Sequence, residues 1–176
     1  GHVLAPGGRL LAGPAFRLLR REFRDRRPAP RPAPERARRL LVTLGGADKA
    51  NVSLLAISAL QDLGSAAPAA DIVVGGANPH LASLEAQVAR GGNLALVRGA
   101  DMPGLMAGAD LALTAGGGAC CELAFMGVPM LAVVVADNQA EGVRRMAAAG
   151  MLRSLGRRED LDRAGLALAR LLMPRT

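Results

Sequence analysis

Residues 109–139, which read ADLALTAGGGACCELAFMGVPMLAVVVADNQ, decide the fold. A short apolar run at 111–114 leads through three glycines into an Ala-rich stretch at 119–126, and a second apolar run follows at 130–135. Both apolar runs are continuous rather than alternating, as in parallel strands buried on both faces. A strand, a helix and a second strand at this spacing predict a right-handed βαβ unit.

The same alternation recurs on both sides of this unit. Further strands are predicted at residues 40–44, 71–74, 94–97 and 152–155, and further helices at 50–63, 79–89, 102–107, 140–148 and 160–172. The fold class is therefore α/β, a Rossmann-like doubly wound parallel sheet of about six strands. A closed eight-fold barrel would need roughly 200 residues or more, and this chain has 176.

Composition narrows the possible partners. Hydrophobic residues make up 51% of the chain, but it has only three Phe, no Trp and no Tyr. A core of Ala, Leu, Val and Met is expected, with no aromatic platforms on which the bases of single-stranded nucleic acid would stack. The two cysteines, Cys120 and Cys121, are adjacent, so neither a structural disulfide nor a zinc site is expected. No metal, cofactor or nucleic-acid partner is predicted.

The positive charge is confined to the beginning of the chain. Residues 17–39 contain ten arginines against Glu22, Asp25 and Glu35, which accounts for the whole net charge of +7. A solvated basic linker and a contact to phosphate or lipid headgroups both fit this segment, and we favour the linker. Four prolines in residues 27–37 exclude a helix or a central strand there.

The chain is therefore divided into two parts. Residues 1–38 are expected to be a lead-in helix and a Pro/Arg-rich linker from an N-terminal domain that lies elsewhere, and residues 39–176 a Rossmann-like domain. The lead-in helix would begin near Pro14, with Phe16, Leu19 and Phe23 at helical spacing. The absence of a predicted disulfide fits a reducing cytosol, and no signal peptide is visible, so a cytoplasmic location is expected. No apolar run reaches the roughly 18–20 residues that span a bilayer, so no transmembrane segment is expected.

Two glycine-rich turns are the candidate ligand sites, because open parallel sheets bind ligands at the carboxyl ends of their strands. Gly45 and Gly46 follow the first predicted strand and would let a phosphate approach the main chain; a tight turn without a ligand is the alternative. The spacing is not that of the G-x-G-x-x-G dinucleotide fingerprint, and no GK[ST] follows as in a phosphate-binding P-loop.

The second turn contains Gly116, Gly117 and Gly118, followed by Ala119. Main-chain N–H groups here would bind a diphosphate; a flexible turn without a ligand is the alternative. Glu122 lies one turn further on. Its carboxylate would be repelled by a diphosphate unless it reached past to ribose hydroxyls, and it also fits a favourable acidic residue in a helical first turn.

Polar residues follow two other strands. Asp137, Asn138 and Gln139 suit sugar hydroxyls, and Asp137 or Asn138 equally suits the N-cap of the next helix. Asn78 before Pro79 is typical of a helix start. His80 has no second ligand or acid at a suitable spacing and is interpreted as a surface histidine.

Several segments together resemble one family. The opening 109–139 stretch resembles the C-terminal domain of GT-B enzymes related to the peptidoglycan UDP-N-acetylglucosamine transferase. It is most similar to the UDP-sugar hydrolases of pseudaminic acid biosynthesis and to spore-coat polysaccharide biosynthesis proteins. LAGPAFRLLRREF, LLVTLGGADKAN, VGGANPHL and DMPGLMAGADL resemble that family's segments in the same order. The resemblance covers about residues 10–156.

This resemblance implies a UDP-sugar held between two Rossmann-like domains. The implied contacts are diphosphate at Gly45, Gly46, Gly116, Gly117, Gly118 and Ala119, ribose at Glu122, uracil at Ala100 and Met102, and sugar at Asn138 and Gln139. It places the general-base histidine of such hydrolases in the N-terminal domain, so no catalytic residue is expected in this chain, and His80 does not match it.

The resemblance implies half of an enzyme that cleaves the UDP–sugar bond by attack of water in bacterial surface-polysaccharide or nonulosonic acid biosynthesis. A GT-B glycosyltransferase donor domain and a non-catalytic nucleotide-sugar-binding module are the alternatives. A nicotinamide-dependent oxidoreductase is disfavoured by the missing fingerprint. The chain alone is expected to be inactive.

Overall fold

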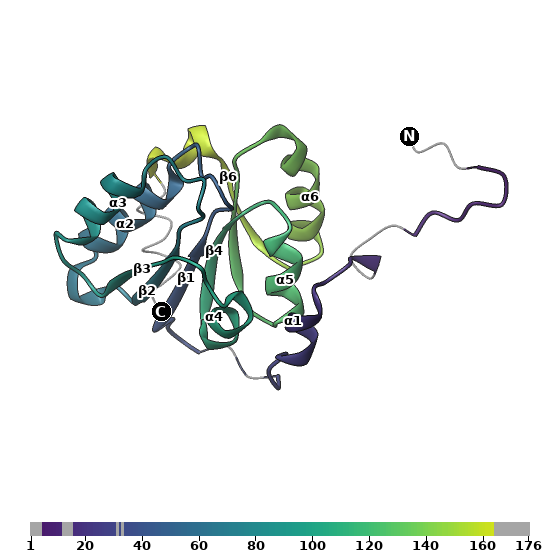
Figure 1. The fold of residues 1–176 in the computed structure, drawn as a ribbon, viewed down its shortest axis with the longest axis horizontal. Helices are drawn as coiled ribbons and strands as arrows, with labels where there is room; N and C mark the ends of the chain where they lie inside the picture. The colour runs from purple at the N-terminus through teal and green to yellow at the C-terminus, as the bar shows by residue number, and fades with distance from the viewer. Residues whose placement is uncertain (1–4, 12–15, 31, 33, 164–176) are drawn as a thin grey trace.

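The computed structural model describes residues 5–11, 16–30, 32 and 34–163. A single parallel sheet of six strands, in the order β3-β2-β1-β4-β5-β6, forms its centre (Figure 1). This confirms the predicted Rossmann-like doubly wound fold. The strands are β1 (Arg39–Thr43), β2 (Ala69–Val73), β3 (Leu94–Val97), β4 (Leu111–Ala115), β5 (Met130–Val134) and β6 (Arg153–Arg157).

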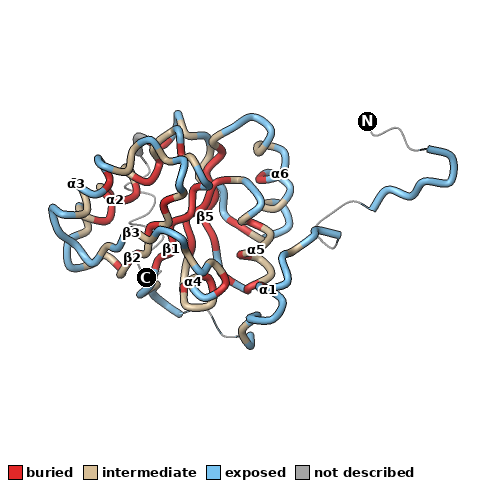
Figure 2. The backbone as a smooth tube through the Cα atoms, viewed as in Figure 1, coloured by how far each residue is buried: buried red, intermediate tan, exposed pale blue. Residues whose placement is uncertain are grey.

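Helices cover both faces of the sheet. One face carries α2 (Val52–Asp62) and α3 (Leu81–Val88), and the other carries α4 (Met102–Gly108), α5 (Ala119–Phe125) and α6 (Asp137–Ala148). Alternate residues of β1 show the division: Leu40 and Val42 pack with α2, whereas Leu41 packs with α4 and α5. The buried residues concentrate in the strands between these two layers (Figure 2).

The order of the strands determines where a ligand can sit. β1 pairs with β2 on one side and with β4 on the other. The chain therefore builds β2 and β3 on one side of β1 and then crosses to build β4 on the other side. Thr43 is in register with Thr114 at the carboxyl ends of β1 and β4. The two glycine-rich loops therefore start side by side at the topological switch point, the usual ligand position in this class of fold.

Several predicted helix boundaries were wrong. α6 begins at Asp137 rather than at residue 140, because Ala136 is the extended residue before the helix. α3 begins at Leu81 rather than at residue 79, because the Asn78 side chain accepts a hydrogen bond from the His80 N–H (2.8 Å) and closes a turn before the helix. The helix predicted at 160–172 is, within the described part of the chain, the 3₁₀ helix η3 (Arg158–Arg163); its remainder lies outside the described residues.

Phe23 anchors the lead-in segment in the core of the domain. Its helix α1 (Arg21–Asp25) is shorter than the predicted lead-in helix, and Phe16 precedes it with 52% of its surface exposed. Phe23, in contrast, is fully buried and joins the core on the α4–α5 face. Residues 5–11 lie away from the domain (Figure 1), whereas Arg17 approaches Gly118. The division at residues 38 and 39 remains a prediction.

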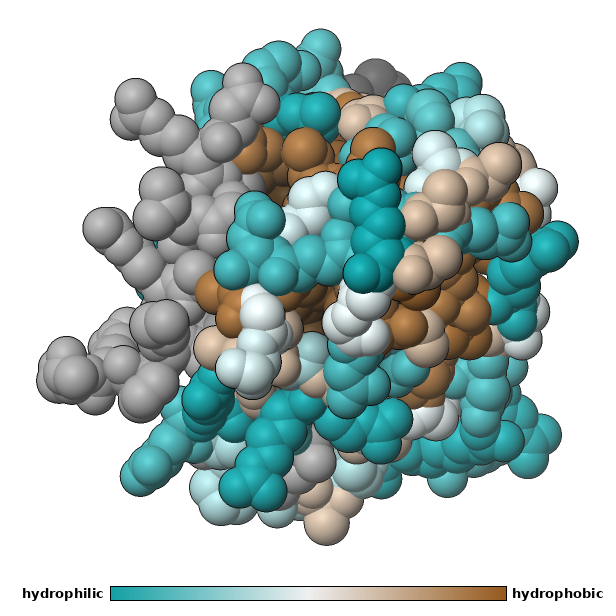
Figure 3. Space-filling view, turned by 90° about the vertical axis from the view of Figure 1, so that its left-hand side faces the viewer, coloured by the Kyte–Doolittle hydropathy of each residue, from teal (hydrophilic) through white to brown (hydrophobic). Residues whose placement is uncertain are grey.

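The face on the side of α2 and α3 combines hydrophilic and hydrophobic side chains. Where Figure 3 colours this face, hydrophobic patches lie in the gaps between hydrophilic side chains. No helix in the described ranges combines the length and the apolar character needed to cross a bilayer.

Candidate functional site

The loop after β1 is open to a ligand. Gly45 adopts a left-handed conformation with φ of 84°, which favours glycine because a Cβ would be strained there. Neither at Gly45 nor at Gly46 would a Cβ meet any heavy atom within 4 Å. The main chain of this turn is therefore accessible from the carboxyl edge of the sheet.

The end of this loop is fixed by a buried carboxylate. Asp48 accepts hydrogen bonds from the N–H groups of Val52 (3.0 Å) and Ser53 (2.9 Å), so it satisfies two free donors in the first turn of α2. Nearby, the Asn51 side-chain oxygen is buried and has no hydrogen-bond partner within the described structure. The role of Asp48 was not predicted, although its position before an apolar helical pattern is a signal for a helix start.

In the loop after β4, the three glycines differ in their surroundings. A Cβ at Gly116 would lie 2.4 Å from the Val143 side chain on α6, so this glycine is required for packing. A Cβ at Gly117 would meet nothing within 4 Å, and one at Gly118 would lie 3.1 Å from a guanidinium nitrogen of Arg17. Packing therefore explains the first glycine, while the other two leave the main chain accessible.

The N–H groups of this loop are only partly used. Gly117 donates to the Ala115 carbonyl (2.7 Å), which tightens the turn. Within the described structure, the N–H groups of Gly118 and Ala119 donate to no backbone acceptor. Two donors thus remain beside the open glycines, next to the positively charged Arg17.

Glu122 lies one turn into α5 and is partly exposed. Its side chain retains 21% of its accessible surface, and one carboxylate oxygen is 3.5 Å from a guanidinium nitrogen of Arg20. Arg20 also pairs with Glu22 at 2.7 Å. The lead-in segment therefore brings a cation to the Glu122 carboxylate, which weakens the repulsion between this carboxylate and an anionic ligand.

Cys120 belongs to the core and not to the site chemistry. Burial is the main cause that raises the pKa of its thiol to about 11, and the neighbouring Cys121 raises it further. Arg17 lowers this pKa by a smaller amount. Its Sγ donates to the Ala115 carbonyl (3.3 Å). Because the neutral thiol is stabilised at neutral pH, Cys120 is not an activated nucleophile.

The loop after β3 contains the residues implied to contact uracil. Gly99 has φ of 59°, Ala100 is half-buried, and Met102 begins α4. Asp101 between them pairs with Arg26 of the lead-in segment. This loop is separated from the β1 loop by β2, so the strand order does not by itself place Ala100 and Met102 beside the glycines.

After β5, the polar residues behave differently from one another. Asp137 is exposed and pairs with Arg157 (2.7 Å), and Asn138 is exposed. The N-cap of α6 is Ala136, without a side-chain cap, so the N-cap interpretation of Asp137 or Asn138 was wrong. Gln139 accepts a hydrogen bond from the Val135 N–H (3.1 Å), and its side chain would contact a Cβ at Gly116.

The structure thus brings part of the predicted site together. Gly45 and Gly46 follow β1, and Gly116, Gly117 and Gly118 follow its paired neighbour β4, so both turns leave the same edge of the sheet. The Gln139 side chain lies beside Gly116. His80 is near the β1 loop, with its Nε2 3.3 Å from the Lys49 carbonyl oxygen. Among the described residues, no group of three or more His, Cys, Asp or Glu side chains could hold a metal ion.

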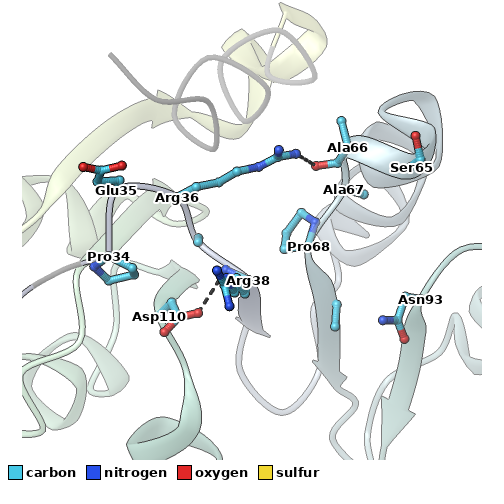
Figure 4. A pocket seen from close by; sticks show the side chains of 12 residues that line it. Pro34, Glu35, Arg36, Arg38, Ser65, Ala66, Ala67, Pro68, Asn93 and Asp110 are labelled. Atoms are coloured by element: carbon cyan, nitrogen blue, oxygen red, sulfur yellow. Dashed lines mark hydrogen bonds between the residues drawn. The ribbon is translucent and has the colours of Figure 1, made fainter. Parts of the chain in front are cut away.

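A pocket of about 740 Å³ lies at the opposite edge of the sheet (Figure 4). Arg38, Asn93 and Asp110, which precede β1, β3 and β4, line it, and Arg36 reaches across to the Ala66 carbonyl. Asp110 already accepts from the N–H groups of Arg38 (2.9 Å) and Arg39 (3.0 Å). Because this pocket faces the amino ends of the strands, it is not the candidate ligand site.

No protein-family model and no curated protein matches this chain. It does resemble solved structures. CalG4, the calicheamicin glycosyltransferase, has a TM-score of 0.58 at 24% identity over 84% of this chain and 35% of its own. UDP-GlcNAc 2-epimerase from Neisseria meningitidis, bound to UDP-GlcNAc, has a TM-score of 0.55 at 18% identity, over 78% of this chain and 37% of its own. Streptomyces sp. SF2575 glycosyltransferase SsfS6, complexed with thymidine diphosphate, has a TM-score of 0.51 at 20% identity, over 77% of this chain and 36% of its own.

These similarities concern the fold. The chain spans little more than a third of the structures it resembles, and at these identities the shared feature is the Rossmann-like arrangement of sheet and helices.

Proposed function

We propose that this chain is the part of a GT-B enzyme that binds a nucleoside-diphosphate sugar, with a UDP-sugar as the substrate. The observation that carries the proposal is the pair of glycine-rich loops at the switch point. Both present accessible main chain at the carboxyl edge, where parallel sheets bind nucleotides.

In this proposal the diphosphate lies against Gly45, Gly46, Gly117 and Gly118. The free N–H groups of Gly118 and Ala119 donate to its oxygens, and Arg17 contributes positive charge. Donors held in place beforehand would also stabilise the negative charge that develops on the departing nucleotide.

The other proposed contacts match polar residues to the ribose and the sugar, and apolar residues to the base. Glu122 accepts hydrogen bonds from the ribose hydroxyls, and Arg20 reduces the repulsion between this carboxylate and the diphosphate. Ala100 and Met102 contact the base. Asn138 and the amide nitrogen of Gln139 face the sugar, since the Gln139 oxygen already accepts from Val135.

Two reactions are compatible with such a donor site. Glycosyl transfer is supported by the likeness to CalG4 and SsfS6, both described as glycosyltransferases. Hydrolysis of the UDP–sugar bond is the second candidate, supported by the motifs in the 109–139 stretch. In both reactions the catalytic base or acceptor site is expected in a second domain, so this chain alone should release no UDP from a UDP-sugar; measurable release would contradict that expectation.

The test is a thermal-shift titration with UDP, with thymidine diphosphate as a second nucleotide and NAD as the negative control. A ligand at about a hundred times its Kd adds roughly 2.7 kcal/mol, or about 5–10 °C in Tm for a chain of this size. The shift should be strongly reduced in Glu122→Gln. It should persist in Glu85→Gln, which removes an exposed carboxylate on α3. No shift with millimolar UDP or thymidine diphosphate, or equal shifts in both variants, would contradict the proposed site.

A further inference from the structure

Residues 20–27, which we call the strap, lie against α4 and α5 (Figure 1). Phe23 at the centre of the strap is fully buried and belongs to the same core cluster as Met106 of α4 and Leu123 of α5. At its two ends, the Arg20 guanidinium lies 4.9 Å from the Phe23 ring centroid and that of Arg27 lies 4.8 Å from the Phe125 centroid. These side-chain contacts hold the strap against the two helices.

One end of the strap contacts the proposed ribose site. Arg20 has one guanidinium nitrogen 2.7 Å from Glu22 and another 3.5 Å from Glu122. Glu22 therefore restrains Arg20 from its own side, and Arg20 in turn faces Glu122 on α5. The Glu122 carboxylate has a defined neighbour before any ligand arrives.

The other end contacts the proposed base site. Arg26 pairs with Asp101, which lies between Ala100 and Met102. A Cβ on Gly104 would lie 2.5 Å from the Asp101 carboxylate and 3.7 Å from Arg26, so the missing side chain at this position leaves room for the pair. The loop after β3 is thereby tied to the same strap as α5.

We propose that Arg20 and Arg26 are positioning residues, which fix the ribose-binding and base-binding sides of the nucleotide site relative to each other through Glu122 and Asp101. The inference rests on the proposed function. The sheet order alone leaves β2 and β1 between the two sides, whereas the strap connects them directly. Both arginines are more than half exposed, so their ion pairs contribute little to global stability and act mainly on local geometry.

The experiment compares Arg20→Gln and Arg26→Gln with Arg21→Gln. Arg21 is the matched control, because it lies in the same strap, is 91% exposed and pairs only with Asp25 within the described structure. UDP and uridine affinities are measured by calorimetry. Amide hydrogen exchange of residues 98–102 and 116–122 is measured without ligand.

We expect Arg26→Gln to raise exchange at 98–102 and Arg20→Gln to raise it at 116–122, each leaving the other segment unchanged. UDP affinity should fall roughly fivefold in each, which corresponds to the loss of one oriented contact. Arg21→Gln should resemble the unaltered chain, and Tm without ligand should be the same in all of them. Arg26→Lys should restore most of the affinity, and Asp101→Asn should add no further loss to Arg26→Gln.

Unchanged exchange in Arg20→Gln and Arg26→Gln, or equal changes in Arg21→Gln, would overturn the inference. So would altered exchange with UDP affinity intact. If the unaltered chain binds no UDP, the proposed function fails, and the exchange results alone then decide whether the strap orders the two loops.

Discussion

Gly46 and Gly75 meet main chain to main chain at the carboxyl edge of the sheet. A Cβ on Gly75 would lie 2.3 Å from the carbonyl oxygen of Gly46 and 2.5 Å from its Cα. The loops after β1 and β2 therefore approach more closely than any side chain would allow. The shape of the β1 loop depends on its neighbour as well as on its own sequence.

Replacing Gly75 by Ala should destabilise the fold. Because the obstructing atoms are backbone, the added methyl cannot be accommodated by a change of rotamer, and a loss of about 1–3 kcal/mol is expected. Urea unfolding measures it. Gly76→Ala is the matched control, since a Cβ there meets nothing within 4 Å; equal stability of the two variants would contradict the contact.

The glycines after β4 should separate stability from binding. In Gly116→Ala the new methyl would lie 2.4 Å from Val143 and 3.1 Å from the Gln139 Cβ, so the free energy of unfolding should fall as α6 is displaced. In Gly117→Ala the methyl enters open space. That variant should keep its stability but bind UDP more weakly, because the methyl occupies the surface proposed for the diphosphate. Unfolding curves and UDP titration on both variants check the two halves independently.

Phe23→Ala should strongly destabilise the fold, although Phe23 lies in the lead-in segment. Removing a fully buried phenyl ring costs about 3–5 kcal/mol when the cavity does not collapse. Phe16→Ala removes the same ring from a position that is 52% exposed and should change the unfolding free energy by less than about 0.5 kcal/mol. If the two variants were equally stable, Phe23 would not be anchored as described.

The two cysteines should differ in reactivity. At pH 8, iodoacetamide should alkylate Cys121 first, because Cys120 is 1% exposed and burial raises its pKa to about 11. Since the raised pKa favours the thiol in the folded state, the stability linked to Cys120 is present below its ordinary pKa of 9.0 and is lost as the pH rises toward 11. Peptide mass spectrometry resolves the order of modification, and Cys120→Ser should abolish the alkaline effect.

Most of the fold followed from the sequence, because strand and helix periodicities alternate clearly in it. The strand positions were predicted to within two residues at each end, and the switch point followed from the topology of such sheets. The predicted start of α6 was too late because Asp137 is a typical N-cap residue, whereas in the structure Ala136 is the N-cap and Asp137 is the first helical residue.

The candidate site was less predictable. The glycines and Glu122 carry local signals, but nothing in the composition distinguishes Arg20 and Arg26 from Arg21 and Arg24. Their contacts with Glu122 and Asp101 depend on where Phe23 is buried, which is set by packing between segments far apart in the chain. A basic, proline-rich segment therefore reads as a linker even where individual side chains are engaged.

The position of β1 also has a consequence for synthesis on the ribosome. β1 lies between β2 and β4, but β4 emerges only after α2, β2, α3, β3 and α4 have been made. Until then, one side of β1 keeps its N–H and C=O groups unpaired, and Leu41 lacks most of the residues that later cover it. The nascent β1–β2–β3 half is thus the stage most open to pairing with a strand of another chain, and the arrival of β4 ends that exposure.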